Sequence, residues 1–424
     1  MCYNNYMELN ITNNLIELAK SLSSPLYVVG GKVRDTLIGY DNDDIDICSA
    51  CRVEEVISKC KELKYKVDVI NKRLGTLLIR PNEDEHYEYT AFRKENYVRG
   101  NHTPSEVEFV EDIKVDASRR DFTINSIYYN VLTKETVDIY GGINDISKKR
   151  VKSIETPAKV FSADGLRILR FVRMVSTLGF KAELKTLKTA REMTYQLRDI
   201  SGERKKKELD YLVVAEKKHG LSKNQFIEIF NKLNIYKHLF LLPCEKYKIS
   251  LNNDYKKFFN LDDDKRFIGF MVLFLLNKYD YKPMPHNLIV NDIQHIMGGV
   301  LKCSNEEQKQ TLNAYLVLQD LKYKPLNNFV AVNYQKLSNF EKFIVNQFVD
   351  VKPVSILLVN MINSGIPVSE NKLDITNEDI IELLGEKYIS KVKHLLLEAC
   401  LMGKLENNKE SLINFIKENI LMKK

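Results

Sequence analysis

The spacing of apolar residues divides the chain into two regions of different character. Up to about residue 150, short apolar runs of strand length alternate with stretches in which apolar residues recur every three or four positions. Beyond that point the strand-like runs nearly vanish, and the three-to-four spacing continues. The pattern predicts a mixed α/β or α+β region followed by an all-helical region.

The first region is predicted to contain both strands and helices. Strands are expected at 26–29, 45–49, 66–70, 76–80, 87–92 and 107–110. Helices are expected at 32–38, 53–63 and 118–129. In the second region, proline-containing breaks at 281–285 and 323–328 mark turns between helical subdomains.

Length and charge add limits to this picture. A chain of 424 residues is too long for one core, so we predict a head at 1–150, a neck at 151–270 and a body with tail at 271–424. The net charge of +7 permits a polyanionic partner without indicating one. The longest apolar run, 267–276, is about half a membrane-spanning helix, and we expect a cytoplasmic protein without membrane contact.

A glycine pair follows the first predicted strand. Gly30 and Gly31 lie between the apolar run 26–29 and the predicted helix 32–38. Without Cβ atoms they let backbone N–H groups approach a ligand, and the positive end of the following helix favours phosphate. A tight strand-to-helix turn is the alternative, and the pair alone favours that alternative.

Two aspartates surround an isoleucine at the next predicted strand. Because residues i and i+2 of a strand face the same side, Asp44 and Asp46 are expected to project together while Ile45 and Ile47 point into the core. Adjacent carboxylates repel one another unless a cation holds them. We therefore predict a metal site with Asp44 and Asp46 as oxygen ligands, which suit Mg²⁺. A polar turn is the alternative explanation.

Taken together, these features resemble a known motif. The segment GGKVRDTLIGYDNDDIDI is similar to G-G-x-V-R-D-x-L-L-G, followed by D-x-D, of class II tRNA nucleotidyltransferases and bacterial poly(A) polymerases. The resemblance implies a polymerase-beta-like head with a mixed sheet, followed by a helical neck, body and tail. It also implies that Gly30, Gly31 and Arg34 hold a nucleoside triphosphate, and that Asp44 and Asp46 are catalytic.

Two later segments extend the resemblance. YEYTAFR is similar to the family strand that offers a third acidic residue, which is Glu88 here, although a surface glutamate is a competing explanation. ASRRDFTINSIYYN is similar to R-R-D-F-T-x-N-A. That similarity implies that Arg120 and Asp121 contact the ribose and phosphates of the nucleotide, with Asn125 supporting them.

A third segment, SADGLRILRFVRM, is similar to the E-D-x-x-R helix that selects the base in this family. Asp164 and Arg167 are three residues apart, so we expect them side by side along a helix. A carboxylate accepts hydrogen bonds and a guanidinium only donates them. Cytosine and adenine present an amine beside an unprotonated ring nitrogen, whereas uracil and guanine present N–H and carbonyl groups. The pair therefore predicts CTP and ATP as substrates and rejection of UTP and GTP.

The chain departs from the motif at one position and adds charges at others. Ala163 stands where the family has glutamate, which would orient Arg167. Arg170 and Arg173 continue the stripe and meet either triphosphate or RNA, with surface ion pairs as the alternative. The segment SGERKKKELDYLV is similar to the family's E-R-x-x-x-E helix, and its residues Glu203, Arg204 and Glu208 are expected to brace the base-selecting helix.

The resemblance implies attack by an RNA 3′-hydroxyl on the α-phosphate of a nucleoside triphosphate, with release of pyrophosphate. The predicted activity is addition of CCA to tRNA from CTP and ATP. The loop at 93–107 departs from the family pattern at Arg99, Asn101 and His102, which leaves CC addition and poly(A) synthesis open. A non-catalytic RNA-binding protein on a decayed scaffold is the hypothesis of another class.

Overall fold

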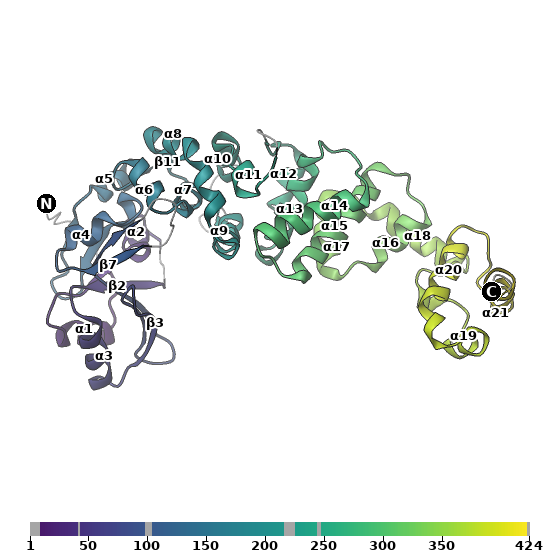
Figure 1. The fold of residues 1–424 in the computed structure, drawn as a ribbon, viewed down its shortest axis with the longest axis horizontal. Coiled ribbons are helices and arrows are strands. Elements are labelled where there is room, and N and C mark those ends of the chain that lie inside the picture. The colour runs from purple at the N-terminus through teal and green to yellow at the C-terminus, as the bar shows by residue number, and fades with distance from the viewer. Residues whose placement is uncertain (1–8, 41–42, 98–103, 216–224, 244–246, 422–424) are drawn as a thin grey trace. The chain divides into compact units, whose positions relative to one another are not determined.

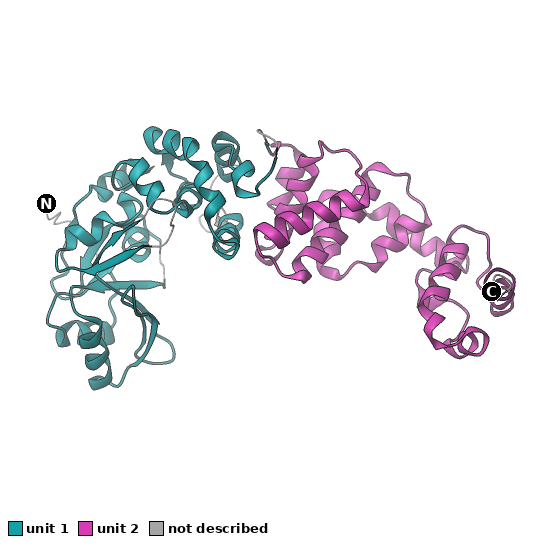
Figure 2. Cartoon of the chain, in the orientation of Figure 1, with its two compact units in different colours: residues 1–248 teal, residues 249–424 magenta. Residues whose placement is uncertain are grey.

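The computed structural model describes residues 9–40, 43–97, 104–215, 225–243 and 247–421 (Figure 1). The chain forms two compact units, residues 1–248 and 249–424 (Figure 2). Among the described residues, every strand lies in the first unit, and the regular elements of the second unit are all helical. The predicted α+β class with a helical remainder is confirmed, whereas the predicted three-part division of the chain stays a prediction.

A seven-stranded mixed sheet forms the centre of the head, in the order β3-β4-β5-β2-β1-β8-β9. Its strands are β1 (Tyr27–Val29), β2 (Ile45–Ser49), β3 (Lys66–Asn71), β4 (Thr76–Arg80), β5 (Tyr87–Ala91), β8 (Ile127–Asn130) and β9 (Thr136–Asp138). Strand β2 is the middle strand and pairs with β5 in parallel and with β1 antiparallel. This position buries Ile47, Cys48 and Ser49.

Shorter elements surround the sheet. The helices of the head are α1 (Asn13–Ser21), α2 (Gly31–Leu37), α3 (Val53–Glu62), α4 (Ile113–Ser118) and α5 (Gly142–Ser147). A separate ribbon pairs β6 (Arg93–Asn96) with β7 (Glu106–Phe109), and a parallel pair joins β10 (Arg150–Val151) to β11 (Lys181–Ala182). The departures of the 93–107 loop from the family pattern fall on 98–103, outside the described residues.

All six predicted strands and two of the three predicted helices of the head are confirmed. The predicted helix at 118–129 is wrong. This segment contains the last residue of α4, the 3-10 turn η1 (Thr123–Asn125) and most of β8. Every residue from 121 to 130 is buried, so the side chains show neither the helical nor the strand period from which a sequence prediction distinguishes the two.

Helices follow the head within the first unit. They are α6 (Pro157–Ala163), α7 (Leu166–Leu178), α8 (Leu184–Glu192), η2 (Thr194–Asp199), α9 (Gly202–Ala215), α10 (Gln225–Leu233) and α11 (Tyr236–Leu239). Between α6 and α7 the helix is interrupted, because Asp164 is extended with φ −149° and ψ 110°. At Gly165 a Cβ would lie 2.8 Å from the backbone oxygen of Gln196, so η2 packs directly against the interruption. The single helix expected to carry Asp164 and Arg167 is therefore wrong.

The second unit is built from helices. Its elements are α12 (Asn253–Phe258), α13 (Asp263–Lys278), α14 (His286–Ile293), η3 (Gln294–Val300), α15 (Asn305–Tyr323), α16 (Asn328–Lys336), α17 (Asn339–Phe348), α18 (Lys352–Asn363), η4 (Glu370–Lys372), α19 (Asn377–Leu384), η5 (Glu386–Tyr388), α20 (Ile389–Leu401), α21 (Lys409–Ile416) and η6 (Lys417–Leu421). Helices α12, α15 and α17 pack against α13, and the later helices pack on one another. The predicted breaks at 281–285 and 323–328 separate α13 from α14 and α15 from α16. In the described parts of the chain, no helix has the length and hydropathy that crossing a membrane requires.

The turn that joins β9 to α5 packs against the 3-10 turn η1 of the head. The carboxylate of Asp138 accepts hydrogen bonds from the backbone N–H groups of Gly142 at 2.8 Å and Ile143 at 2.9 Å, which begins α5. A Cβ on Gly142 would lie 2.3 Å from the backbone oxygen of Thr123. Only glycine fits at this contact.

We expect Gly142→Ala to destabilise the first unit by about 2 kcal/mol, because the added methyl group must displace the backbone of η1. Thermal unfolding followed by circular dichroism measures the effect. The matched control is Gly299→Ala, where the nearest atom to a new Cβ would be 3.7 Å away. Equal unfolding midpoints for the two variants would contradict this packing.

Candidate active site

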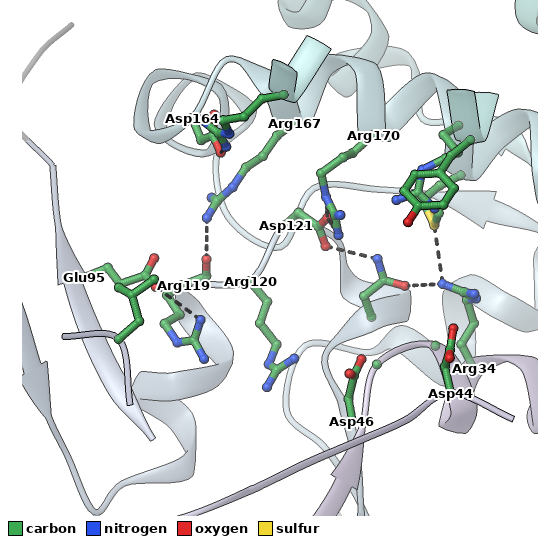
Figure 3. A pocket seen from close by; sticks show the side chains of 18 of the residues that line it. Arg34, Asp44, Asp46, Glu95, Arg119, Arg120, Asp121, Asp164, Arg167 and Arg170 are labelled. Atoms are coloured by element: carbon green, nitrogen blue, oxygen red, sulfur yellow. Dashed lines mark hydrogen bonds and ion pairs between the residues drawn. The ribbon is translucent and has the colours of Figure 1, made fainter. Parts of the chain in front are cut away.

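A pocket of about 840 Å³ gathers almost all the residues that the sequence singled out. It is lined by Gly30, Gly31, Arg34, Asp44, Asp46, Arg120, Asp121, Asn125, Asp164, Arg167, Arg170 and Arg173, among others. Glu88 is the one predicted site residue that does not line it. The pocket lies between the sheet of the head and helices α7 and α9, so segments distant in sequence meet there (Figure 3).

The glycine pair brings the backbone close to one of the aspartates. Gly30 has φ +79°, a conformation that residues with a Cβ rarely adopt, and it directly precedes α2. A Cβ at this position would lie 3.4 Å from Oδ2 of Asp46. The glycine pair therefore forms a tight strand-to-helix turn, and it also lines the pocket, where a ligand could approach its backbone.

Asp44 and Asp46 both line the pocket, Asp44 immediately before β2 and Asp46 on it (Figure 3). Asp46 is exposed to solvent, although many protein atoms surround its carboxylate. This desolvation, together with the negative charges of Glu88 and Asp44, raises the pKa of Asp46 to about 6, against the opposing effect of Arg120. The charges at this point favour a cation beside Asp46.

Glu88 lies on β5 directly opposite Asp46 in the parallel β2–β5 pair. The sequence therefore placed it correctly beside the aspartates. Its side chain is exposed, and within the described ranges of the chain no three carboxylate, histidine or cysteine side chains are arranged to hold one metal ion. The structure supports an electrostatic effect of Glu88 on Asp46, and the role of Glu88 as a metal ligand stays a prediction.

A buried chain of hydrogen bonds joins the head to α7. Nε of Arg34 donates to Asp35 at 2.8 Å, and Nη1 of Arg34 donates to Oδ1 of Asn125 at 2.7 Å. Nδ2 of Asn125 donates to Oδ1 of Asp121 at 3.1 Å, and Nε of Arg170 donates to Oδ2 of Asp121 at 2.8 Å (Figure 3). We call these five residues the polar relay. It fixes two guanidinium groups on opposite walls of the pocket.

The charge of Asp121 is strongly stabilised within the polar relay. Burial opposes ionisation, but Arg170, the hydrogen bond from Asn125 and the charge of Arg167 hold the pKa of Asp121 well below its usual value. Because Asp121 is already paired, the structure gives it a positioning contact with Arg170, while the predicted contact with a nucleotide is untested.

Arg120 is held by Tyr128 and Asp116, two residues that were not predicted to belong to the site. Its Nε donates to the hydroxyl of Tyr128 at 2.9 Å and its Nη2 donates to Asp116 at 3.1 Å. Asp116 is fully buried and also accepts from Tyr128 at 2.7 Å. The spacing of four residues between Asp116 and Arg120 at the end of a helix was a signal that could have revealed this pair.

Asp164 and Arg167 both line the pocket, and the backbone N–H of Arg167 donates to the backbone oxygen of Asp164 at 3.0 Å, but their side chains bond to other groups rather than to each other. Asp164 accepts from Arg204 at 2.6 Å and from the backbone N–H of Leu166 at 3.0 Å. Nη2 of Arg167 donates to the backbone oxygen of Arg119 at 2.7 Å (Figure 3). The expected lateral pair along one helix is wrong because the chain is extended at Asp164.

Helix α9 braces α7, as the sequence predicted. Arg204 pairs with Asp164, and Glu208 accepts a hydrogen bond from Nε of Arg173. The guanidinium of Arg173 also lies over the ring of Tyr211, 5.6 Å from its centroid. Arg170 and Arg173 therefore form ion pairs, in the wall of the pocket rather than on an open surface.

The sequence analysis missed a second charged cluster at the edge of the pocket. Glu95 accepts hydrogen bonds from Arg93, Arg119 and Tyr97 and is almost fully buried. A buried glutamate in a strand of charged residues has no sequence pattern of its own. Including this cluster, eight arginines and six acidic residues line the pocket among the residues that the structure describes, and this excess of positive charge suits a polyphosphate.

The chain resembles known proteins over its head and more distantly over its whole length. The poly A polymerase head domain model matches residues 26–152. A CCA-adding enzyme of Lactococcus lactis subsp. cremoris strain MG1363 is 38% identical over 200 residues, which cover 46% of this chain and 48% of that protein. The chain thus spans about half the length of this relative. A CCA-adding enzyme of Enterococcus faecalis is 26% identical, and the match covers 92% of this chain and 91% of that protein.

Solved structures share the fold. The Bacillus stearothermophilus CCA-adding enzyme in complex with CTP is 19% identical with a TM-score of 0.65, and the match covers 97% of this chain and 99% of that one. The Thermotoga maritima CCA-adding enzyme complexed with tRNA is 19% identical with a TM-score of 0.61, over 94% and 92% of the two chains. The match of residues 26–152 to the poly A polymerase head domain, together with these relatives and structures, confirms the resemblance of the chain to class II tRNA nucleotidyltransferases and bacterial poly(A) polymerases.

Proposed function

We propose that the protein is a template-independent nucleotidyltransferase that adds CCA to the 3′ end of tRNA from CTP and ATP, with release of pyrophosphate. The observation that carries the proposal is that one pocket is lined by the paired aspartates, by several arginines and by Asp164 and Arg167. Relatives named CCA-adding enzymes support it. We also propose that the protein acts in the cytoplasm.

Asp44 and Asp46 would hold Mg²⁺ in this reaction. The raised pKa of Asp46, caused by desolvation and by the charges of Glu88 and Asp44, is relieved when a cation neutralises the carboxylates. Mg²⁺ commonly takes only one or two protein carboxylates and completes its shell with phosphate oxygens and water, so this donor set fits. When bound, the ion would make the RNA 3′-hydroxyl a better nucleophile and stabilise the charge of the departing pyrophosphate.

The arginines of the pocket would orient the triphosphate. Arg34 and Arg170 are fixed at the two ends of the polar relay, and Arg120 is fixed by Asp116 and Tyr128. Each guanidinium keeps further N–H donors for phosphate oxygens, because a guanidinium has five. Phosphoryl transfer needs little covalent help from the protein, so groups that are already positioned account for much of the rate.

Asp164 and Arg167 would select the base. Asp164 would accept a hydrogen bond from the exocyclic amine of cytosine or adenine, and Arg167 would donate to the ring nitrogen beside it. Uracil and guanine would meet Arg167 with an N–H group and Asp164 with a carbonyl. A buried mismatch of this kind leaves polar groups unpaired and is strongly rejected.

The first test is the product. The protein is incubated with Mg²⁺, labelled CTP and ATP, and tRNA lacking its last three nucleotides, and the products are sequenced. We expect addition that stops at CCA. Addition of CC alone indicates the partial enzyme and a long A-tail indicates a poly(A) polymerase, whereas no incorporation would support the non-catalytic alternative.

The second test concerns the aspartates. We expect Asp46→Asn to lower kcat by about a thousandfold while CTP binding in the absence of RNA is largely kept, because the carboxylate acts on the metal and not on the base. Asp43→Asn is the matched control, since Asp43 is a neighbouring exposed aspartate outside the pocket lining. Comparable turnover of the two variants would contradict the metal role.

The third test concerns base choice. We expect Arg167→Ala to raise incorporation of UTP relative to CTP by about a hundredfold, because the donor that opposes the N–H of uracil is removed. Arg191→Ala, an exposed arginine on α8, serves as control. If Arg167→Ala still excludes UTP as strongly as the unmodified protein, base choice does not depend on Arg167.

A further inference from the structure

Arg167 is positioned by backbone carbonyl groups. Its Nη2 donates to the oxygen of Arg119 at 2.7 Å, and its Nη1 donates to the oxygen of Val160 at 3.4 Å. Ala163, at the position where the family motif has a glutamate, offers no carboxylate to orient the guanidinium. Ala163 and Arg167 instead line a second cavity of about 730 Å³ beside the pocket. The orientation of Arg167 therefore depends on where the Arg119 carbonyl lies.

The side chain of Arg119 determines that position. Arg119 directly follows α4, and its guanidinium pairs with Asp116 at 2.8 Å and with Glu95 at 3.3 Å. Asp116 is shared, because it also accepts from Arg120 and Tyr128. Glu95 on β6 is the second anchor of Arg119, and its carboxylate lies beside the Arg119 guanidinium (Figure 3).

Glu95 is itself fixed in one orientation. Only 5% of its side chain is exposed, Oε1 accepts from Nε of Arg93 at 2.7 Å, and Oε2 accepts from the hydroxyl of Tyr97 at 2.6 Å. Burial opposes ionisation, but the charges of Arg119 and Arg93 outweigh it and hold the pKa of Glu95 below its usual value. Glu95 is therefore a rigid, charged acceptor with both oxygens in use.

We propose that Glu95 is a positioning residue for base selection. It anchors Arg119, whose backbone carbonyl orients the guanidinium of Arg167, so a carboxylate on β6 performs indirectly what a glutamate at position 163 would do by direct contact. The inference rests on the proposed function, because it assigns the support of the base-selecting arginine in that reaction. It explains how the chain keeps a defined orientation of Arg167 with alanine at 163.

The test is Glu95→Gln, which keeps the shape of the side chain and removes its charge. Its matched control is Glu108→Gln on β7, an exposed glutamate of the same ribbon in register with Lys94. Binding of CTP and of UTP to each protein is measured by calorimetry with Mg²⁺ and without RNA, and incorporation of both nucleotides is measured with tRNA. We expect the preference for CTP over UTP to fall about tenfold in Glu95→Gln and to be unchanged in the control.

A second substitution separates positioning from a general loss of structure. In the double variant Glu95→Gln with Ala163→Glu, the new carboxylate enters the cavity beside Arg167, and we expect the preference for CTP to return. A merely structural role of Glu95 would lower thermal stability without this rescue. If Glu95→Gln does not fold, Arg119→Lys makes the same test, because a lysine cannot bridge Asp116 and Glu95 with a planar fork.

The outcomes are distinguishable. An unchanged CTP preference in folded Glu95→Gln, or a lost preference that Ala163→Glu does not restore, overturns the inference while CCA addition by the unmodified protein still stands. If the unmodified protein incorporates no nucleotide, the proposed function fails, and the binding preference measured without RNA still decides the role of Glu95. Equal binding of CTP and UTP by the unmodified protein also overturns it.

Discussion

The polar relay from Arg34 to Arg170 is the constraint on which the rest of the site depends. Burying a charged side chain is costly unless a partner of opposite charge and satisfied hydrogen bonds accompany it, and in the relay each group has both. The relay crosses from α2 through the 3-10 turn to α7. It therefore fixes the position of Arg170 on α7 relative to Arg34 on α2 before any ligand is bound.

The acidic residues around the pocket fall into two electrostatic classes. Asp121 and Glu95 are surrounded by arginines, which lower their pKa values in spite of burial, so these carboxylates stay charged and hold cationic side chains in place. Asp46 has a raised pKa because it is desolvated and faces Glu88 and Asp44. Asp121 and Glu95 hold the arginines that line the pocket. Asp46 is destabilised as a carboxylate and would be stabilised by a bound cation.

Sequence reasoning was most successful where a residue pattern has one structural meaning. The glycine pair and the alternating Asp44–Asp46 segment located the floor of the pocket, and R-R-D located Arg120 and Asp121. It failed where tertiary contacts decide. The run of buried residues at 121–130 gave no strand pattern for β8, and the break between α6 and α7 at Asp164, where η2 packs against Gly165, has no local sequence pattern. Glu95 was missed because Arg119, its partner 24 residues away, reaches it only in the folded chain.

The interruption between α6 and α7 has a consequence for how specificity is built. Asp164 stands on an extended residue tied to α9 through Arg204, whereas Arg167 stands on a helix and is tied to the head through the Arg119 carbonyl. The acceptor and the donor that we propose to read the base thus have separate supports, one from α9 and one from the head. The distance between the Asp164 carboxylate and the Arg167 guanidinium therefore depends on both supports. A change in either support could alter that distance while Asp164 and Arg167 themselves stay the same.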